Sequence, residues 1–455
     1  MDIEFFKKLI NSKLKLFLLV SFIILWLSLG IHPINLLNYS WNTSNFINTL
    51  KFFIGIATLL IPIILTFILL IIKKNRLIFL KLGLLPLFII LYFICQIIGI
   101  ILSNNELINL YFTLNGISTL FLLVLIYKTF SKKEFNFFLI FSLIILATSF
   151  LFYFYKYLKI FILIEGQTFY GAWGAVSFLE NNEAIPRPTG LARTGLILFI
   201  CLYFAYFINN SKKILYILIF LAASILLFQS RAIIFLFVLF IFSSYFFFKK
   251  QLFFFKLKKT IFIFFIIPIL LFFTSNFLKI KLIESNLISK EFIYRALNLD
   301  ENNNIVGKKQ FHKHFSSDQK YTREIDSETF TSGRVRDWEK ILSAELKLFG
   351  YGTQGDRKLT NGSTAANALL YALSSAGIIG LFIMILIYFK TIKELYKIYL
   401  EKKYHNFYIY SSICILIILL LRSILESSFA VFGIDYIIFL QCYLIIKKVK
   451  KIKKI

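Results

Sequence analysis

Long apolar runs recur along the whole of this 455-residue chain, and Lys, Asn or Pro bounds each of them. The runs are about 18 residues or longer, which is enough to cross the roughly 30 Å hydrocarbon core of a bilayer as a helix. Hydrophobic residues make up 59% of the chain and its mean hydropathy is +0.79, whereas apolar residues are roughly half of a soluble protein. We therefore expect an all-α, polytopic integral membrane protein.

The hydropathy pattern predicts about twelve transmembrane helices. The predicted spans are residues 16–31, 52–72, 77–102, 107–127, 136–155, 191–208, 214–228, 232–248, 260–277, 366–389, 406–425 and 434–446. No internal repeat and no proline- or glycine-rich linker separates them. We accordingly expect one membrane domain over residues 1–455.

Clusters of lysine occupy alternate connections between these spans, as well as both ends of the chain. Because cytoplasmic loops concentrate Lys and Arg, one orientation places every cluster in the cytoplasm, with both termini inside. This topology also accounts for most of the net charge of +28. We therefore predict that the positive charge reflects insertion in the lipid bilayer, and that the protein does not bind nucleic acid.

The same orientation leaves three sizeable segments outside the cytoplasm: residues 32–51, 156–190 and 278–365. The last is the largest and lies between the ninth and tenth predicted spans. Within it, apolar residues recur at helical spacing, so we predict an amphipathic helix over residues 333–349 that packs on the membrane domain. Its apolar face is Val335, Trp338, Leu342 and Leu346, its cap is Ser332 and its left-handed end is Gly350.

Arginine is distributed differently from lysine. The ten arginines are Arg76, Arg187, Arg193, Arg231, Arg295, Arg323, Arg334, Arg336, Arg357 and Arg422. Only Arg76 lies in a predicted cytoplasmic connection, although the positive-inside rule treats Lys and Arg alike. The planar guanidinium binds phosphate oxygens in pairs and keeps its charge, whereas lysine is a point charge. The bias indicates an anionic, phosphate-like ligand outside the cytoplasm.

The individual arginines allow two interpretations. Pro186 and Pro188 restrict the backbone around Arg187, which suits a side chain that must be aimed, whereas Arg193 serves either the ligand or the anchoring of its span. An arginine near the bilayer core needs a partner or a wet cavity. For Arg422, the alternative to a ligand is an internal ion pair, with Glu426 one helical turn later or with Asp435.

Several sequence patterns look like cofactor or metal motifs but lack the context that such motifs need. The sequence GYGTQG at 350–355 has the glycine spacing of a dinucleotide-binding loop, but it follows a predicted helix and not a strand. His312 and His314 have no carboxylate or cysteine at ligand spacing, and the four cysteines fall inside apolar spans. We predict no metal site and no cofactor.

Four segments occur in an order that resembles the O-antigen ligase and O-antigen polymerase superfamily. They are RPTGLARTGLILF (187–199), LLFQSRAIIFLFVLF (226–240), TSGRVRDWEKILSAELKLFGYGTQG (331–355) and ANALLYALSSAGIIGLFIMIL (366–386). The resemblance is clearest over residues 185–390, and the large outer loop is part of it. It implies a GT-C-like helical fold in the bacterial inner (cytoplasmic) membrane.

The resemblance also implies a function. Such enzymes transfer a glycan from undecaprenyl diphosphate to an acceptor hydroxyl, without a metal or a nucleotide sugar. In this family arginines hold the diphosphate, and the motif match assigns that role to Arg187, Arg231 and Arg334, with Arg193 and Arg336 as neighbours. Fixed guanidinium groups stabilise the charge that grows on the leaving phosphate, and a carboxylate can take the hydroxyl proton.

Glu426 is the predicted carboxylate, and Arg422 and Asp435 are predicted to contact the diphosphate or glycan. Ligases carry a histidine shortly before the tenth span, where this chain has Ala365 and Ala366, followed by Asn367. We therefore expect a repeat-unit polymerase that works with a flippase and a chain-length regulator. The alternatives are an O-antigen ligase that transfers glycan to lipid A–core, a flippase or other transporter of lipid-linked oligosaccharide, and an envelope scaffold.

Overall fold

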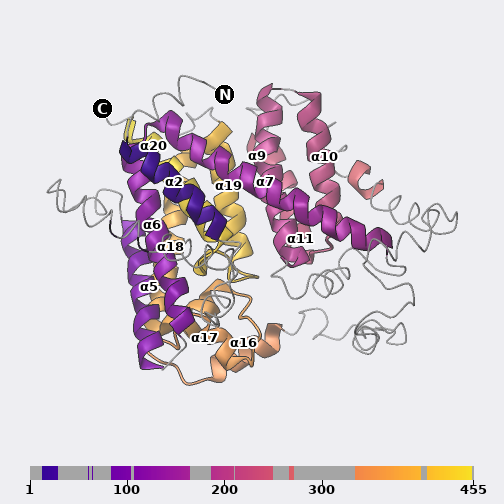
Figure 1. Cartoon of the computed structure of the whole chain (residues 1–455). Helices are drawn as coiled ribbons and strands as arrows, with labels where there is room; N and C mark the ends of the chain where they lie inside the picture. Colours follow the sequence, from indigo (N-terminus) through magenta and orange to yellow (C-terminus); the bar gives the residue numbers. More distant parts are fainter. Residues whose placement is uncertain are drawn as a thin grey trace, which may run out of the picture. The chain divides into compact units, whose positions relative to one another are not determined.

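The computed structural model describes residues 13–28, 84–103, 107–163, 186–209, 211–248, 266–270, 334–400 and 407–452, together with positions 60 and 64. Every regular element in these ranges is a helix, as expected (Figure 1). The chain divides into two compact units where one membrane domain was predicted: unit 1 is Met1–Ile145 with Arg334–Ile455, and unit 2 is Leu146–Gly333.

Unit 1 is built from helices at both ends of the sequence. They are α2 (Lys13–Ser28), α5 (Leu84–Leu102), α6 (Leu107–Thr129), the first part of α7 (Lys132–Leu163), α16 (Arg334–Ser343), α17 (Gly355–Leu359), α18 (Ala368–Leu400), α19 (Phe407–Arg422), the 3-10 turn η2 (Ser428–Ala430) and α20 (Ile434–Ile452). Helix α18 packs along α5, which also packs on α6, and α19 packs on α20 (Figure 1). Segments more than 250 residues apart in the sequence thus form one core.

Unit 2 contains the rest of α7 with α9 (Pro188–Asn209), α10 (Lys212–Leu227) and α11 (Arg231–Phe248). Helix α9 packs against both α10 and α11. The contact surfaces are rich in aromatic rings: the ring of Phe199 on α9 meets that of Phe237 on α11 edge to face, with centroids 5.0 Å apart.

Five helices in the described residues are long and apolar enough to cross a membrane. They are Leu84–Leu102, Asn109–Thr129, Lys132–Lys159, Pro188–Phe207 and Ala368–Ile398. This agrees with a membrane-embedded helical protein. The predicted spans at 52–72 and 260–277 lie largely outside the described residues, as do the predicted outer segment 32–51 and residues 278–333.

Helix α7 is longer than predicted. It continues to Leu163, eight residues into the predicted outer segment 156–190. Tyr157 and Phe161 lie four residues apart and are 0% and 5% exposed. The buried apolar stripe of the helix therefore continues past Lys156 and Lys159, beyond the predicted end of the span at residue 155.

The helix observed in place of the predicted amphipathic helix 333–349 is shorter, and it buries a different face. Helix α16 ends at Ser343. Its buried side chain is Ile341, whereas Val335 and Leu342 of the predicted apolar face are 42% and 58% exposed. Gly350 does have a positive φ of +69°, but it lies seven residues beyond the helix end.

Helix α18 is interrupted at Gly377, whose φ of 72° and ψ of −164° are not helical. Residues 347–352 supply hydrogen bonds to the backbone groups that the interruption exposes. The bonds are Tyr351 N–H to Ser374 O (2.8 Å), Gly352 N–H to Ser375 O (2.9 Å), Ile378 N–H to Lys347 O (3.2 Å) and Ile379 N–H to Leu348 O (3.3 Å). On the other side, a Cβ at Gly99 of α5 would lie 2.4 Å from the carbonyl oxygen of Phe349. The segment is therefore wedged between α5 and the two halves of α18.

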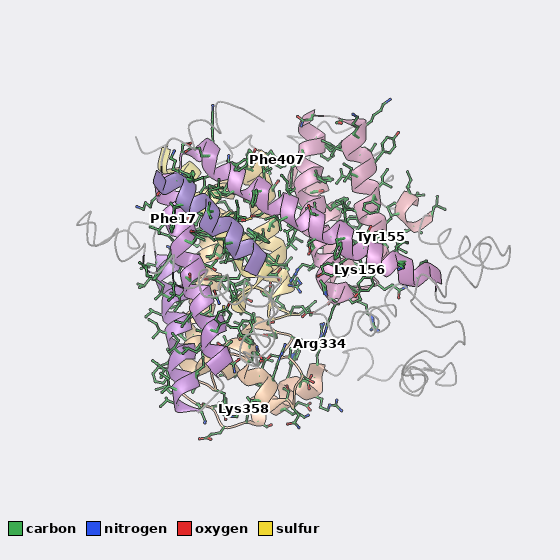
Figure 2. All side chains as sticks on the ribbon, viewed as in Figure 1. Phe17, Tyr155, Lys156, Arg334, Lys358 and Phe407 are labelled. Carbon is green, nitrogen blue, oxygen red and sulfur yellow. The ribbon has the colours of Figure 1, made fainter. Side chains whose placement is uncertain are left out.

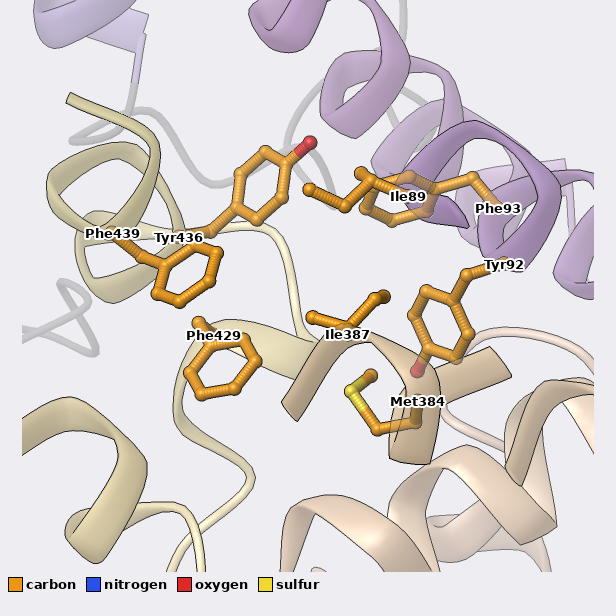
Figure 3. Close-up of a pocket in the computed structure, with 8 residues that line it drawn as sticks. All are labelled: Ile89, Tyr92, Phe93, Met384, Ile387, Phe429, Tyr436 and Phe439. Carbon is orange, nitrogen blue, oxygen red and sulfur yellow. The ribbon is translucent and has the colours of Figure 1, made fainter. Parts of the chain in front are cut away.

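A small apolar cavity of about 10 Å³ lies among α5, α18, η2 and α20 (Figure 3). Tyr92 and Met384 line one part of it, and Phe429 and Phe439 line another. A cavity of this size holds at most about one water molecule. It is a gap in the packing, and a sugar or diphosphate does not fit into it.

Candidate functional site

Two of the predicted site residues, 92 positions apart, meet in unit 1. Arg334 is the first residue of α16 (Figure 2), and its Nη2 lies 3.2 Å from Oε1 of Glu426. The two side chains are 28% and 26% exposed. The pair combines a cation and a carboxylate that a ligand can reach.

Trp338 ties α16 to the segment that leads into α18. Its indole N–H donates to the carbonyl oxygen of Ala365 at 2.6 Å. The N–H of Ala365 donates to the carboxylate of Asp356 at 2.8 Å, and both Ala365 and Asp356 are buried. Burial raises the pKa of Asp356, and the backbone N–H bonds of Ala365 and Arg357 oppose that rise. Both backbone groups of Ala365 are therefore fixed by side chains.

Asn367 links the start of α18 to the segment that carries Glu426. Its Oδ1 accepts the N–H groups of Leu369 and Leu370 at 2.9 and 3.1 Å, which is the arrangement of a helix N-cap. Its Nδ2 donates to the carbonyl oxygen of Ile424 at 2.9 Å. One amide side chain thus caps a helix and holds the backbone two residues before Glu426.

Arg422 has the internal partner that the sequence offered as an alternative. At the end of α19 its guanidinium forms an ion pair with Asp435 at the start of α20, and the side chains are 8% and 3% exposed. Ser428 donates to the same carboxylate at 3.1 Å. Of the two candidate carboxylates, Asp435 therefore pairs with Arg422, and Glu426 pairs with Arg334.

In unit 2, Arg187 and Arg231 lie at the beginnings of α9 and α11. The carbonyl of Arg187 accepts the N–H groups of Gly190 and Leu191, and Pro188 occupies the first helical position. Arg187 and Arg231 are exposed at these helix starts, and Arg193, in the second turn of α9, is half-buried. Pro188 thus explains how the backbone of Arg187 is set.

Tyr157 of α7 contacts the residue before Arg187 and the end of α10, shortly before Arg231, and it was not recognised in the sequence. Its hydroxyl donates to the carbonyl of Pro186 at 2.9 Å, and its ring meets that of Phe228 edge to face with centroids 5.7 Å apart. Pro186 precedes Arg187 directly, and Phe228 lies three residues before Arg231. The only signal in the sequence was a tyrosine that continues the apolar stripe of α7.

Arg187, Arg231 and Arg334 share a position at the N-terminal end of a helix. The N-terminus of a helix carries partial positive charge, so a cation there adds to a positive potential and favours an anion nearby. Arg336, in the first turn of α16, is exposed and adds to the potential around Arg334.

Among the described residues, no group of three His, Cys, Asp or Glu side chains could hold a metal ion. Cys95, Cys201, Cys414 and Cys442 are free and buried. His312 and His314 lie outside the described residues. Arg334 and Glu426 are the predicted site residues that form a partly exposed ion pair in unit 1.

The resemblance to the O-antigen ligase and polymerase superfamily rests on the four sequence segments alone. Comparison with family models, with characterised proteins and with solved structures finds no match.

Proposed function

We propose that this chain is a membrane glycosyltransferase that polymerises oligosaccharide repeat units carried on undecaprenyl diphosphate. The observation that carries the proposal is the contact between Arg334 and Glu426 at the start of α16. It joins the two groups that such a transfer needs, a cation for the leaving diphosphate and a base for the acceptor hydroxyl.

Arg334 is suited to bind a diphosphate. One nitrogen contacts Glu426 and the side chain is about a quarter exposed, so other N–H donors of the guanidinium can reach a ligand. Phosphate oxygens match the fork of these donors. Arg336 adds charge from the same turn, and the N-terminus of α16 adds the partial charge of the helix dipole.

In the proposed step, the acceptor hydroxyl oxygen attacks the anomeric carbon of the donor sugar. The bond between that carbon and the diphosphate oxygen breaks, and its electron pair leaves with the diphosphate. Arg334 stabilises the charge that develops there. Glu426 accepts the hydroxyl proton, so the products are a glycosidic bond, undecaprenyl diphosphate and a protonated carboxyl group. No cofactor takes part.

Arg187 and Arg231 are the proposed second group of phosphate-binding arginines. Their exposed positions at the starts of α9 and α11 support the role. Arg193 is half-buried, which favours anchoring of α9, whereas Arg422 and Asp435 form a buried pair and support the site from within.

Polymerase is favoured over ligase by the segment before α18. Where ligases carry a histidine, this chain has Ala365, which is buried with both backbone groups hydrogen-bonded. We place the enzyme in the bacterial inner membrane with both termini in the cytoplasm, alongside a flippase and a chain-length regulator.

The test is polymer synthesis by the purified protein in proteoliposomes with undecaprenyl-diphosphate-linked repeat units. Arg334→Ala and Glu426→Gln should each reduce chain elongation by about 100-fold or more, since each removes a charge-stabilising or proton-accepting group. Lys358→Ala and Glu339→Gln remove exposed charges of the same sign from α17 and α16 and should have no effect. Full elongation by both site variants would refute the proposal.

A cellular experiment distinguishes a polymerase from the alternative enzyme, an O-antigen ligase. Deletion of a polymerase leaves single repeat units on the acceptor, whereas deletion of a ligase leaves long lipid-linked polymer without an acceptor. Elongation in proteoliposomes that lack any ion or substrate gradient would exclude a transporter.

A further inference from the structure

We infer that Asn367 and Trp338 are positioning residues that hold Glu426 opposite Arg334. Their role in catalysis rests on the proposed function, whereas their role in placing the two segments rests on the hydrogen bonds alone.

Three segments that are distant in sequence form a closed ring of contacts. Helix α16 carries Arg334 and, one turn later, Trp338, whose indole N–H bonds to the carbonyl of Ala365 at 2.6 Å. Two residues on, Asn367 donates to the carbonyl of Ile424 at 2.9 Å. Two residues after Ile424, Glu426 closes the ring on Arg334 at 3.2 Å.

The ion pair alone is too weak to hold this geometry. Both side chains are about a quarter exposed, and partly solvated pairs contribute little to stability. Helix α16 has ten residues, a length that is marginal without tertiary contacts. Burial of Ile341 holds α16 on unit 1, and the bonds of Trp338 and Asn367 are the side-chain hydrogen bonds that connect it, through residues 365–367, to the segment of Glu426.

The ring is anchored to the core. The buried carboxylate of Asp356 fixes Ala365 at its N–H, opposite the carbonyl that Trp338 uses. Next to Asn367, the N–H of Ala368 bonds to the carbonyl of Ser423 at 2.8 Å. A shift of either segment would break these bonds as well, so the ring has one favoured arrangement.

Asn367 has two functions that one substitution separates. Aspartate is as good an N-cap as asparagine, so Asn367→Asp keeps the acceptor for Leu369 and Leu370. An ionised aspartate has no donor, and it repels the carbonyl oxygen of Ile424. The variant therefore keeps α18 and its backbone bond to Ser423, and loses only the side-chain bond to Ile424.

The experiment measures elongation and KM for the lipid-linked repeat unit in proteoliposomes. Asn367→Asp and Trp338→Phe should each lower kcat by about 10- to 100-fold, because a displacement of about 1 Å at a reacting group has an effect of this size. The matched control is Trp26→Phe, since the buried indole N–H of Trp26 has no hydrogen-bond partner among the described residues. It should elongate like the wild type.

A double-mutant cycle tests whether Asn367 acts through Glu426. In the Glu426→Gln background, Asn367→Asp should cause no further loss of kcat, whereas two independent effects would multiply. Multiplying effects, or unchanged kcat in Asn367→Asp, would overturn the inference and leave the proposed function standing.

Amide hydrogen exchange of the purified protein supplies a readout that needs no activity. Asn367→Asp should speed exchange in residues 423–430, Trp338→Phe should speed it in α16, and the remainder of α18 should stay protected. If the wild type elongates nothing but these changes occur, the proposed function fails and the positioning stands. Unchanged exchange in both segments overturns the positioning, whatever the activity.

Discussion

At the scale of the residue, two ion pairs in unit 1 differ in burial, and this difference separates their roles. Arg422 and Asp435 are almost fully buried, whereas Arg334 and Glu426 are about a quarter exposed. A buried pair that loses one member leaves an uncompensated charge, which is far costlier than loss of an exposed pair. The first pair therefore belongs to the fold and the second is available to a ligand.

Arg422→Met alone should abolish the folded protein, because loss of one partner of a buried pair costs about 3–5 kcal/mol. Arg422→Met combined with Asp435→Leu should restore folding, since an apolar pair of similar volume replaces the charges. Thermal unfolding in detergent and polymer formation in cells measure the two effects. A double variant that folds as the wild type does but makes no polymer would show that the pair serves activity as well as folding.

Asp356 should give the fold a distinct pH dependence. Burial raises its pKa, so the folded state binds the proton more tightly than the unfolded state. Its contribution to stability is therefore greatest in acid and falls as the pH rises through the raised pKa. Asp356→Asn keeps the acceptor for the Ala365 N–H without the charge, so its melting temperature should match the wild type near pH 4 and equal or exceed it at pH 7.

Asp356→Ala is the contrasting variant. It leaves the buried N–H of Ala365 without an acceptor, at a cost of about 1–3 kcal/mol at every pH. If Asp356→Asn is as unstable as Asp356→Ala at pH 7, the bond to Ala365 is not the function of this side chain.

At the scale of the element, the interruption of α18 depends on glycine. A Cβ at Gly377 would lie 2.3 Å from the carbonyl oxygen of Leu348, and its φ of +72° strains any other residue. Gly377→Ala should therefore prevent stable folding, as seen by loss of the monodisperse peak in size-exclusion chromatography. Gly433→Ala is the control, because a Cβ there meets nothing within 4 Å. Normal folding of Gly377→Ala would mean that α18 is continuous.

The sequence predicted helices well and their interruptions poorly. The long apolar runs at 77–102, 191–208 and 406–425 locate α5, α9 and α19, because each run is long enough to form a membrane helix. The break at Gly377 lies inside an apolar run, and its hydrogen-bond partners, residues 347–352, are backbone groups about 30 positions earlier. No side-chain pattern encodes backbone partners, so this part of the fold was not predictable.

In the candidate site, too, the charged residues could be predicted from the sequence, whereas the contacts that bring them together could not. Arg334 could be singled out by the distribution of the arginines and by motif match, and Glu426 as a carboxylate one helical turn after Arg422. Their mutual contact depends on Trp338 and Asn367, which bond to the backbone carbonyls of Ala365 and Ile424. Any residue supplies a carbonyl, and therefore neither bond leaves a signal in the sequence.

At the scale of the whole molecule, the predicted topology is open to a direct test. The native cysteines are buried, so they give little background in labelling with a membrane-impermeant maleimide. Leu342→Cys in α16 and Lys397→Cys near the end of α18 both replace exposed residues. In spheroplasts the first should be labelled at once, and the second only after permeabilisation. If Leu342→Cys is labelled only after permeabilisation, the assignment of residues 334–359 to the outer face is wrong, and if Lys397→Cys is labelled at once, its cytoplasmic placement is wrong.

The wedge formed by residues 347–352 constrains the order in which the protein can be assembled. Its hydrogen-bond partners lie on both sides of Gly377, in a helix that the ribosome makes only after the wedge itself. Its other neighbour, Gly99 of α5, is made about 250 residues earlier. The wedge therefore stays undocked during synthesis until α18 has been inserted beside α5. Closure of this joint is therefore a late step of biogenesis.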